Sequence, residues 1–185
     1  MSLPEPFALF MRDHAATGAL VEDARGQVEA AIVYDDDPTL VPAAVAALRT
    51  LQQFLRVDLE RHIRREEDAL FPAFQALARN DELIHGMLTQ HRRIEERREV
   101  LGRLIAALDH DHEELDQARG RLAEALATPV LTVADLQRLV DGVRQLDWML
   151  QGHFGDEEDD LLVPGADLFT GEARDQLAAA IERIQ

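Results

Sequence analysis

Hydrophobic residues recur along most of the chain in steps of three and four, which is the spacing of one face of an α-helix. This pattern predicts long helices over about residues 4–32, 42–79, 81–127 and 132–161, and a shorter one over about 172–184. Asp37-Pro38 and Thr128-Pro129 separate them, and Thr132 with Asp135 resembles a helix capping box. Four long amphipathic helices with short connections favour an all-α, up-down-up-down four-helix bundle.

The chain of 185 residues is long enough for one domain with a full core. We expect residues 1–163 to form the bundle. Residues 164–185 are then a C-terminal extension whose short helix packs on the outside of it.

Histidines and glutamates interrupt the apolar stripes of the four long helices. His62 and His153 each begin the motif H-x-x-x-E-E-D, in which the histidine and the first glutamate lie on one helix face. In an antiparallel bundle the starts of the first and third helices share an end with the finishes of the second and fourth. The predicted metal ligands at this level are His14, His62, Glu66, His91, Glu95, His153 and Glu157.

Several carboxylates and imidazoles in one core would destabilise the fold unless a multivalent cation joined them. A purely structural polar layer is the alternative. Imidazole and carboxylate ligands without any thiolate suit iron, manganese or zinc. Six or seven ligands exceed one tetrahedral zinc. The preferred cofactor is therefore two iron ions bridged by Glu66 and Glu157, with manganese or zinc also compatible.

Two further histidines are followed by an acid at the same spacing, His110 by Glu114 and His112 by Asp116. They lie about 28–32 Å along the third predicted helix from His91, from the rise of an α-helix. We therefore expect them to lie outside the cluster. Both are then mostly solvated charge, with a hydrogen-bonded core histidine as a second interpretation of His112, and a second cation site at this level is the alternative.

At these residues the sequence resembles the hemerythrin-like family, also called HHE cation-binding domains. The resemblance rests on His14, on His62-x-x-x-Glu66 with Leu70-Phe71-Pro72, on His91-x-x-x-Glu95 and on His153-x-x-x-Glu157. It implies a four-helix bundle around a non-haem di-iron centre. Oxygen-carrying hemerythrin has two histidines four apart on its third helix, whereas this chain has His91 and then Glu95. The extra carboxylate would favour ferric iron and makes reversible oxygen carriage the less expected role.

Three functions remain open from the sequence. The first is a hemerythrin-like di-iron protein that binds or senses O₂, NO or iron through the redox state of its metals. The second is a di-iron oxidase, a peroxidase or an iron-cluster repair protein, so enzymatic activity and catalytic residues stay undecided. The third is a bundle whose metal, for example zinc, is structural.

Composition narrows the range of partners. A net charge of −17 and a pI near 4.7 disfavour nucleic acid and anionic membrane surfaces. The absence of cysteine excludes disulfides, iron–sulfur clusters and thiolate zinc sites. The N-terminal MSLPEPF lacks a basic patch followed by an apolar core, and no apolar stretch of about 18 residues occurs. The expected location is the cytoplasm, and O₂ or NO is the expected small ligand; no protein partner is predicted.

Overall fold

The computed structural model describes residues 3–79, 91–128 and 131–184, and for residues 78–79 and 91–101 the backbone alone. This described part consists of helices and their connections and contains no strand. The all-α prediction is confirmed. None of the described helices combines the length and the apolar composition needed to cross a membrane.

The helices fall into four long runs and one short final helix. The first run is α1 (Phe7–Val33). The second comprises α2 (Leu40–Phe54), η1 (Leu55–Leu59), α3 (Glu60–Arg65), η2 (Glu66–Leu70) and α4 (Phe71–Arg79). The third is α6 (His91–Leu126), and the expected start of this helix at Asp81 lies outside the described residues. The fourth comprises α7 (Val133–Glu157), η3 (Glu158–Leu162) and α8 (Val163–Leu168), and α9 (Gly171–Glu182) follows.

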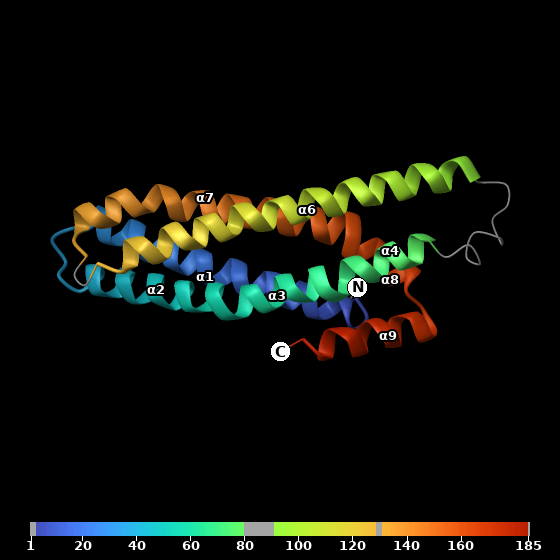
Figure 1. Cartoon of the computed structure of the whole chain (residues 1–185). Coiled ribbons are helices and arrows are strands. Elements are labelled where there is room, and N and C mark those ends of the chain that lie inside the picture. The colour runs from blue at the N-terminus through green and yellow to red at the C-terminus, as the bar shows by residue number, and fades with distance from the viewer. Residues whose placement is uncertain (1–2, 80–90, 129–130, 185) are drawn as a thin grey trace.

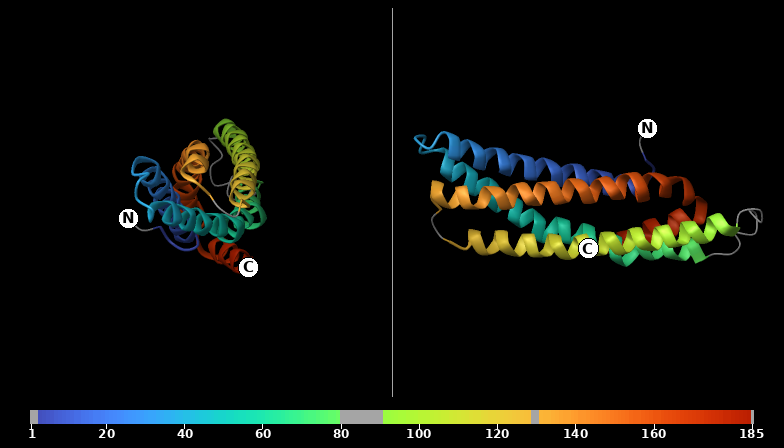
Figure 2. Two further views of the ribbon diagram at one scale, coloured as in Figure 1. Left: turned by 90° about the vertical axis from the view of Figure 1, so that its left-hand side faces the viewer. Right: turned by 90° about the horizontal axis from the view of Figure 1, so that it is seen from above.

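The four runs lie lengthwise beside one another, and successive runs point in opposite directions (Figures 1 and 2). Helix α1 packs against both α2 and α7, and α6 packs against α7. The connections α1–α2 and α6–α7 lie at one end of the molecule, and α8 and α9 lie at the other (Figure 1). The chain thus forms two helical hairpins, one from each half of the sequence.

The predicted start of the fourth run is confirmed in its details. The Thr132 N–H donates to Asp135 Oδ2 at 2.8 Å, and the Asp135 N–H donates to Thr132 Oγ1 at 3.4 Å. This reciprocal pair satisfies two of the free N–H groups at the helix start. It fixes the position along the chain from which α7 begins.

Two wide, π-helical turns follow the repeated H-x-x-x-E-E-D motifs. The turn η2 begins at Glu66, and η3 begins directly after Glu157. Each ends shortly before a proline, Pro72 or Pro164, which has no N–H and whose ring crowds the carbonyl four residues earlier. The wider turn accommodates this local conflict, and such turns are frequent at functional sites.

The core is divided by a buried polar layer. On the side of the hairpin connections, one apolar cluster extends from Val21 and Leu48 to Ile63 and Phe154. On the other side, a second cluster is built around Phe7, Phe10, Phe71 and Phe74 and is covered by Leu177 and Ile181 of α9. The polar side chains between the two clusters form the site described next.

Candidate metal centre

Six buried polar side chains converge in the middle of the molecule, and none of them is more than 4 % exposed. They are His14 from α1, His62 from α3, Glu66 from the start of η2, His112 from α6, and His153 and Glu157 from α7. They form two overlapping groups of four, each with ligand atoms within 4.8 Å of one another. Both groups include Glu66 and Glu157, which lie between the two pairs of histidines.

The first group combines the two histidines of the N-terminal hairpin with the shared glutamates. His14 Nε2 lies 3.2 Å from His62 Nε2. His62 Nε2 lies 2.7 Å from Glu66 Oε1, and His14 Nε2 lies 3.2 Å from Glu157 Oε2. Three of the four side chains thus come from one hairpin, and Glu157 comes from the other.

The second group repeats this arrangement with the C-terminal hairpin. His112 Nε2 lies 3.1 Å from His153 Nε2. His112 Nε2 lies 3.3 Å from Glu66 Oε2, and His153 Nε2 lies 3.8 Å from Glu157 Oε2. The contacts of the second group thus correspond to those of the first group with the two hairpins exchanged.

Each histidine also has an outer carboxylate beside its second ring nitrogen. The pairs are His14 Nδ1 with Glu158 Oε1 at 2.9 Å, His62 Nδ1 with Asp13 Oδ2 at 3.3 Å, His112 Nδ1 with Glu67 Oε1 at 2.9 Å, and His153 Nδ1 with Asp111 Oδ2 at 3.4 Å. A carboxylate in this position accepts a hydrogen bond from Nδ1–H and leaves the Nε2 lone pair free to bind a metal. The two shortest pairs cross between the hairpins.

The residues fit a metal cation, on the evidence of their unpaired atoms. All four carboxylate oxygens of Glu66 and Glu157 are buried, and none accepts a hydrogen bond from a described residue outside the cluster. Burying two carboxylates side by side costs several kcal/mol or more unless positive charge balances them. The Nε2 atoms of the two pairs lie 3.2 and 3.1 Å apart, close enough for both atoms of a pair to bind one ion. Nitrogen and oxygen donors without sulfur suit iron, manganese or zinc.

The shifts of their pKa values divide the four histidines into two kinds. Burial lowers the pKa of His14 to about 3, and it also lowers the pKa of His153. Burial disfavours charge on His62 as well, but the carboxylates of Glu66 and Asp13 outweigh it and raise the pKa of His62 to about 9. Each pair of the same hairpin therefore has one histidine that stays neutral near pH 7.

The two glutamates are also unequal. Burial raises the pKa of Glu157 well above its ordinary value, and the negative charge of Glu66 raises it further. For Glu66, burial acts in the same direction, but His62 and His112 outweigh it and hold the pKa below its ordinary value. The same interactions raise the pKa of His112. Protons on the histidines and on Glu157 thus offset part of the negative charge of the carboxylates, which a bound cation would otherwise offset.

Five of the seven predicted ligands are brought together, and His112 completes the cluster. The expectation that His112 lies outside the cluster is wrong, because its Nε2 approaches both His153 and Glu66. On the continuous helix α6, His91 and Glu95 precede His112 by 21 and 17 residues, about 31 and 26 Å along the axis. The structure does not bring these two positions to the cluster. Their side chains lie outside the described residues, and their role as ligands stays a prediction.

The number of residues from the α6–α7 connection identifies His112 as the residue level with His153. His112 precedes the Thr132 N-cap by 20 residues, and His153 follows it by 21. His91 precedes the same cap by 41 residues and cannot lie level with His153 on a straight helix. The prediction instead chose His91, near the expected start of the third helix. That choice assumed that this helix begins level with the cluster.

A buried layer of histidines around two glutamates in a helical protein is a donor set that could hold metal cations. The hemerythrin HHE cation-binding domain matches residues 5–106. This match spans more than half of the chain, and the chain belongs to the hemerythrin HHE cation-binding family. It includes His14, His62 and Glu66 and ends before His112. Comparison with curated proteins and with solved structures gives no match.

Proposed function

We propose that this chain is a non-haem di-iron protein built on an up-down-up-down bundle of the hemerythrin type. One iron would be held by His14 and His62, the other by His112 and His153, and Glu66 and Glu157 would bridge them. The observation that carries this proposal is the presence of the same two glutamates in both groups of four. Two separate mononuclear sites would not require shared carboxylates.

We further propose that the centre binds or senses O₂ or NO through the redox state of the iron. Iron supplies the reactivity toward these diatomic molecules when it is bound. The chain holds the four imidazoles in one orientation through the outer carboxylates and excludes water with aromatic side chains. The His14 ring is stacked on Phe154 with centroids 4.0 Å apart, and Phe10 lies against His62 with centroids 5.5 Å apart.

The test is the metal content of anaerobically purified protein, with its optical spectrum before and after exposure to air. We expect two irons per chain and an absorption change in air. Glu66→Ala should lose stoichiometric iron. His110→Ala is the control, because His110 is an exposed histidine of α6 that lies outside the cluster. One zinc per chain, or two irons retained in Glu66→Ala, would contradict the proposal.

A further inference from the structure

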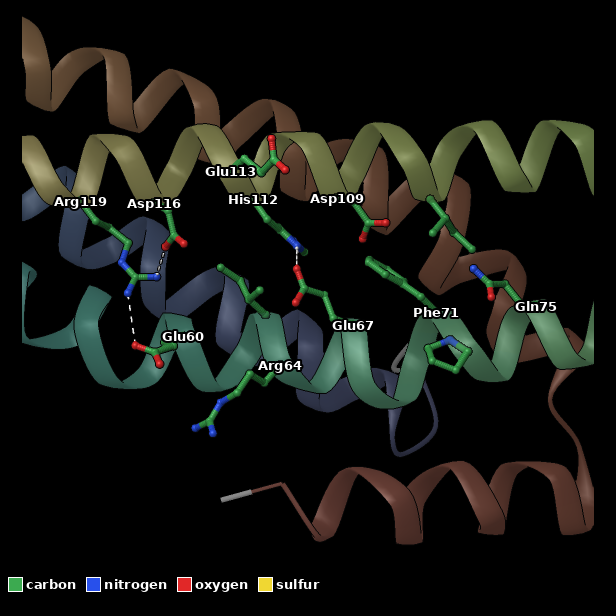
Figure 3. Close-up of a pocket in the computed structure, with 13 residues that line it drawn as sticks. Glu60, Arg64, Glu67, Phe71, Gln75, Asp109, His112, Glu113, Asp116 and Arg119 are labelled. Carbon is green, nitrogen blue, oxygen red and sulfur yellow. Dashed lines mark hydrogen bonds and ion pairs between the residues drawn. The ribbon is translucent and has the colours of Figure 1, made fainter.

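A groove on the surface reaches the metal centre from one side. It has a volume of about 700 Å³ and lies between the α3–α4 run and α6. His112 forms part of its inner wall, next to Glu67 and Phe71 (Figure 3). The other hollows described on the surface are lined by none of the six buried residues of the centre.

The lining of this groove is predominantly acidic. Five carboxylates and two arginines line it: Glu60, Glu67, Asp109, Glu113 and Asp116, with Arg64 and Arg119. At one end the Arg119 guanidinium is bonded to Glu60 at 3.3 Å and to Asp116 at 2.8 Å. Arg64 points away from α6 in the close-up (Figure 3). Carboxylates outnumber arginines in the lining of the groove, which favours cations over anions.

The carboxylates at the inner end of the groove connect it with the buried centre. Glu67, Asp109 and His112 place a ligand atom each within 4.8 Å of one another. Directly behind His112, at 3.3 Å from its Nε2, lies an oxygen of Glu66 that is fully buried and accepts no hydrogen bond from a described residue outside the cluster. Glu67 is the next residue after Glu66 and is 42 % exposed. A carboxylate at the surface and a carboxylate of the buried cluster thus follow each other within one helical turn.

We propose that this groove is the entrance through which a hydrated divalent cation reaches the metal centre, and that Glu67 is the positioning residue at its inner end. This inference rests on the proposed function. The cation exchanges water first for the oxygens of Glu67 and Asp109 and then for Glu66 and the histidine nitrogens. The His112–His153 side is the point of arrival. The His14–His62 side is closed by Phe154 and Phe10.

The experiment measures the rate at which the metal-depleted full chain takes up cobalt(II), whose visible absorption reports binding. Asp109→Asn/Glu113→Gln removes two charges from the groove. Asp159→Asn/Asp160→Asn removes two exposed charges close to the centre but outside the groove. We expect the groove variant to lower the uptake rate about threefold or more and to weaken its dependence on salt, whereas the control stays close to the unmodified chain. Final cobalt content should be equal in all three proteins.

A second pair of variants isolates Glu67. Glu67→Gln and Glu158→Gln each replace an outer carboxylate that is 2.9 Å from a histidine Nδ1, and each keeps a hydrogen-bond acceptor. We expect uptake to slow more in Glu67→Gln, because only Glu67 lines the groove. Equal rates within both pairs would overturn the inference and leave the proposed function intact. An unmodified chain that takes up no cobalt would instead overturn the proposed function.

Discussion

The His14–His62 pair and the His112–His153 pair offer the same donor atoms but have different surroundings. In both pairs the Nε2 atoms face each other at 3.1–3.2 Å, and in both pairs carboxylates bond the outer nitrogens. The first pair is covered closely, with the His14 ring stacked on Phe154 at 4.0 Å. In the second pair, the ring nearest in parallel orientation to His112 is Phe71, at 6.1 Å, and the groove begins there.

The two halves also differ in charge. Asp13, the outer carboxylate of His62, is bonded to Arg65 at 3.2 Å. The equivalent position three residues after His153 is Asp156, so Asp111 has no corresponding arginine from this helix. We infer from this comparison that the two pairs share their donor atoms, and that the next layer of residues would decide from which side a cation is reached and how strongly it is held.

The largest effect should come from the residues that the two halves share. Glu66→Gln keeps the size of the side chain but removes a charge from both groups of four, so we expect both halves to lose metal. Metal content per chain, measured after gel filtration, should fall from two to near zero. Loss from one half alone would show that Glu66 does not bridge.

The next effect shows which histidine of the third run, His112 or His91, is the metal ligand. His112→Ala should halve the metal content, because it removes one ligand of the second group only. His91→Ala should leave the content unchanged, because α6 places position 91 about 31 Å away along its axis. The opposite outcome, with metal lost in His91→Ala and retained in His112→Ala, would restore the prediction made from the sequence.

Smaller changes are expected from the outer carboxylates. Removal of such a partner commonly lowers metal affinity about 10–100-fold. We expect the loss of metal affinity in Asp111→Ala to fall in this range. The loss in Asp13→Ala should be larger, because this variant also leaves Arg65 without this partner at the edge of the core. Competition with a chelator of known affinity measures both variants. Equal losses would mean that the charge difference between the halves has no effect on binding.

The last effect is the dependence on pH, which is measured on the unmodified chain. The pKa of His62 is raised to about 9, so His62 binds a proton near pH 7 in the chain without metal, and Glu66 and Glu67 raise the pKa of His112 above its ordinary value as well. A cation must displace the proton of His62, and apparent affinity therefore falls as the pH drops below about 9, by up to about tenfold per pH unit. Calorimetry in buffers of different ionisation enthalpy should detect the released protons. Binding without proton release would contradict the assignment.

Periodicity and spacing were sufficient for much of this site. The apolar stripes predicted the helices, and the repeated H-x-x-x-E-E-D motif identified both shared glutamates, because helix geometry alone brings positions i and i+4 to one face. Helix length was the weak point. His112 was rejected as a ligand because a helix can continue past the cluster at either end. Only the number of residues from the α6–α7 connection shows which turn of the third run lies level with His153.

The outer carboxylates could not be assigned from sequence. Asp13 and Asp111 directly precede His14 and His112, and this repeated Asp-His pair is visible in the sequence. Yet each aspartate is bonded to the other histidine of its hairpin, and Glu67 and Glu158 are bonded to histidines of the opposite hairpin. These contacts depend on how the helices are rotated against each other. Local spacing does not contain that information.

The crossing of these contacts makes the centre an isologous interface within a single chain. His14 is held by Glu158 of the second hairpin, and His112 is held by Glu67 of the first. Two identical hairpins related by a two-fold axis would form the same contacts between separate subunits. A cation bound by residues of both hairpins would link the two halves of the chain. Fragments 1–79 and 91–185, expressed separately, should consequently reassemble more tightly when metal is present, because neither fragment has a complete ligand set.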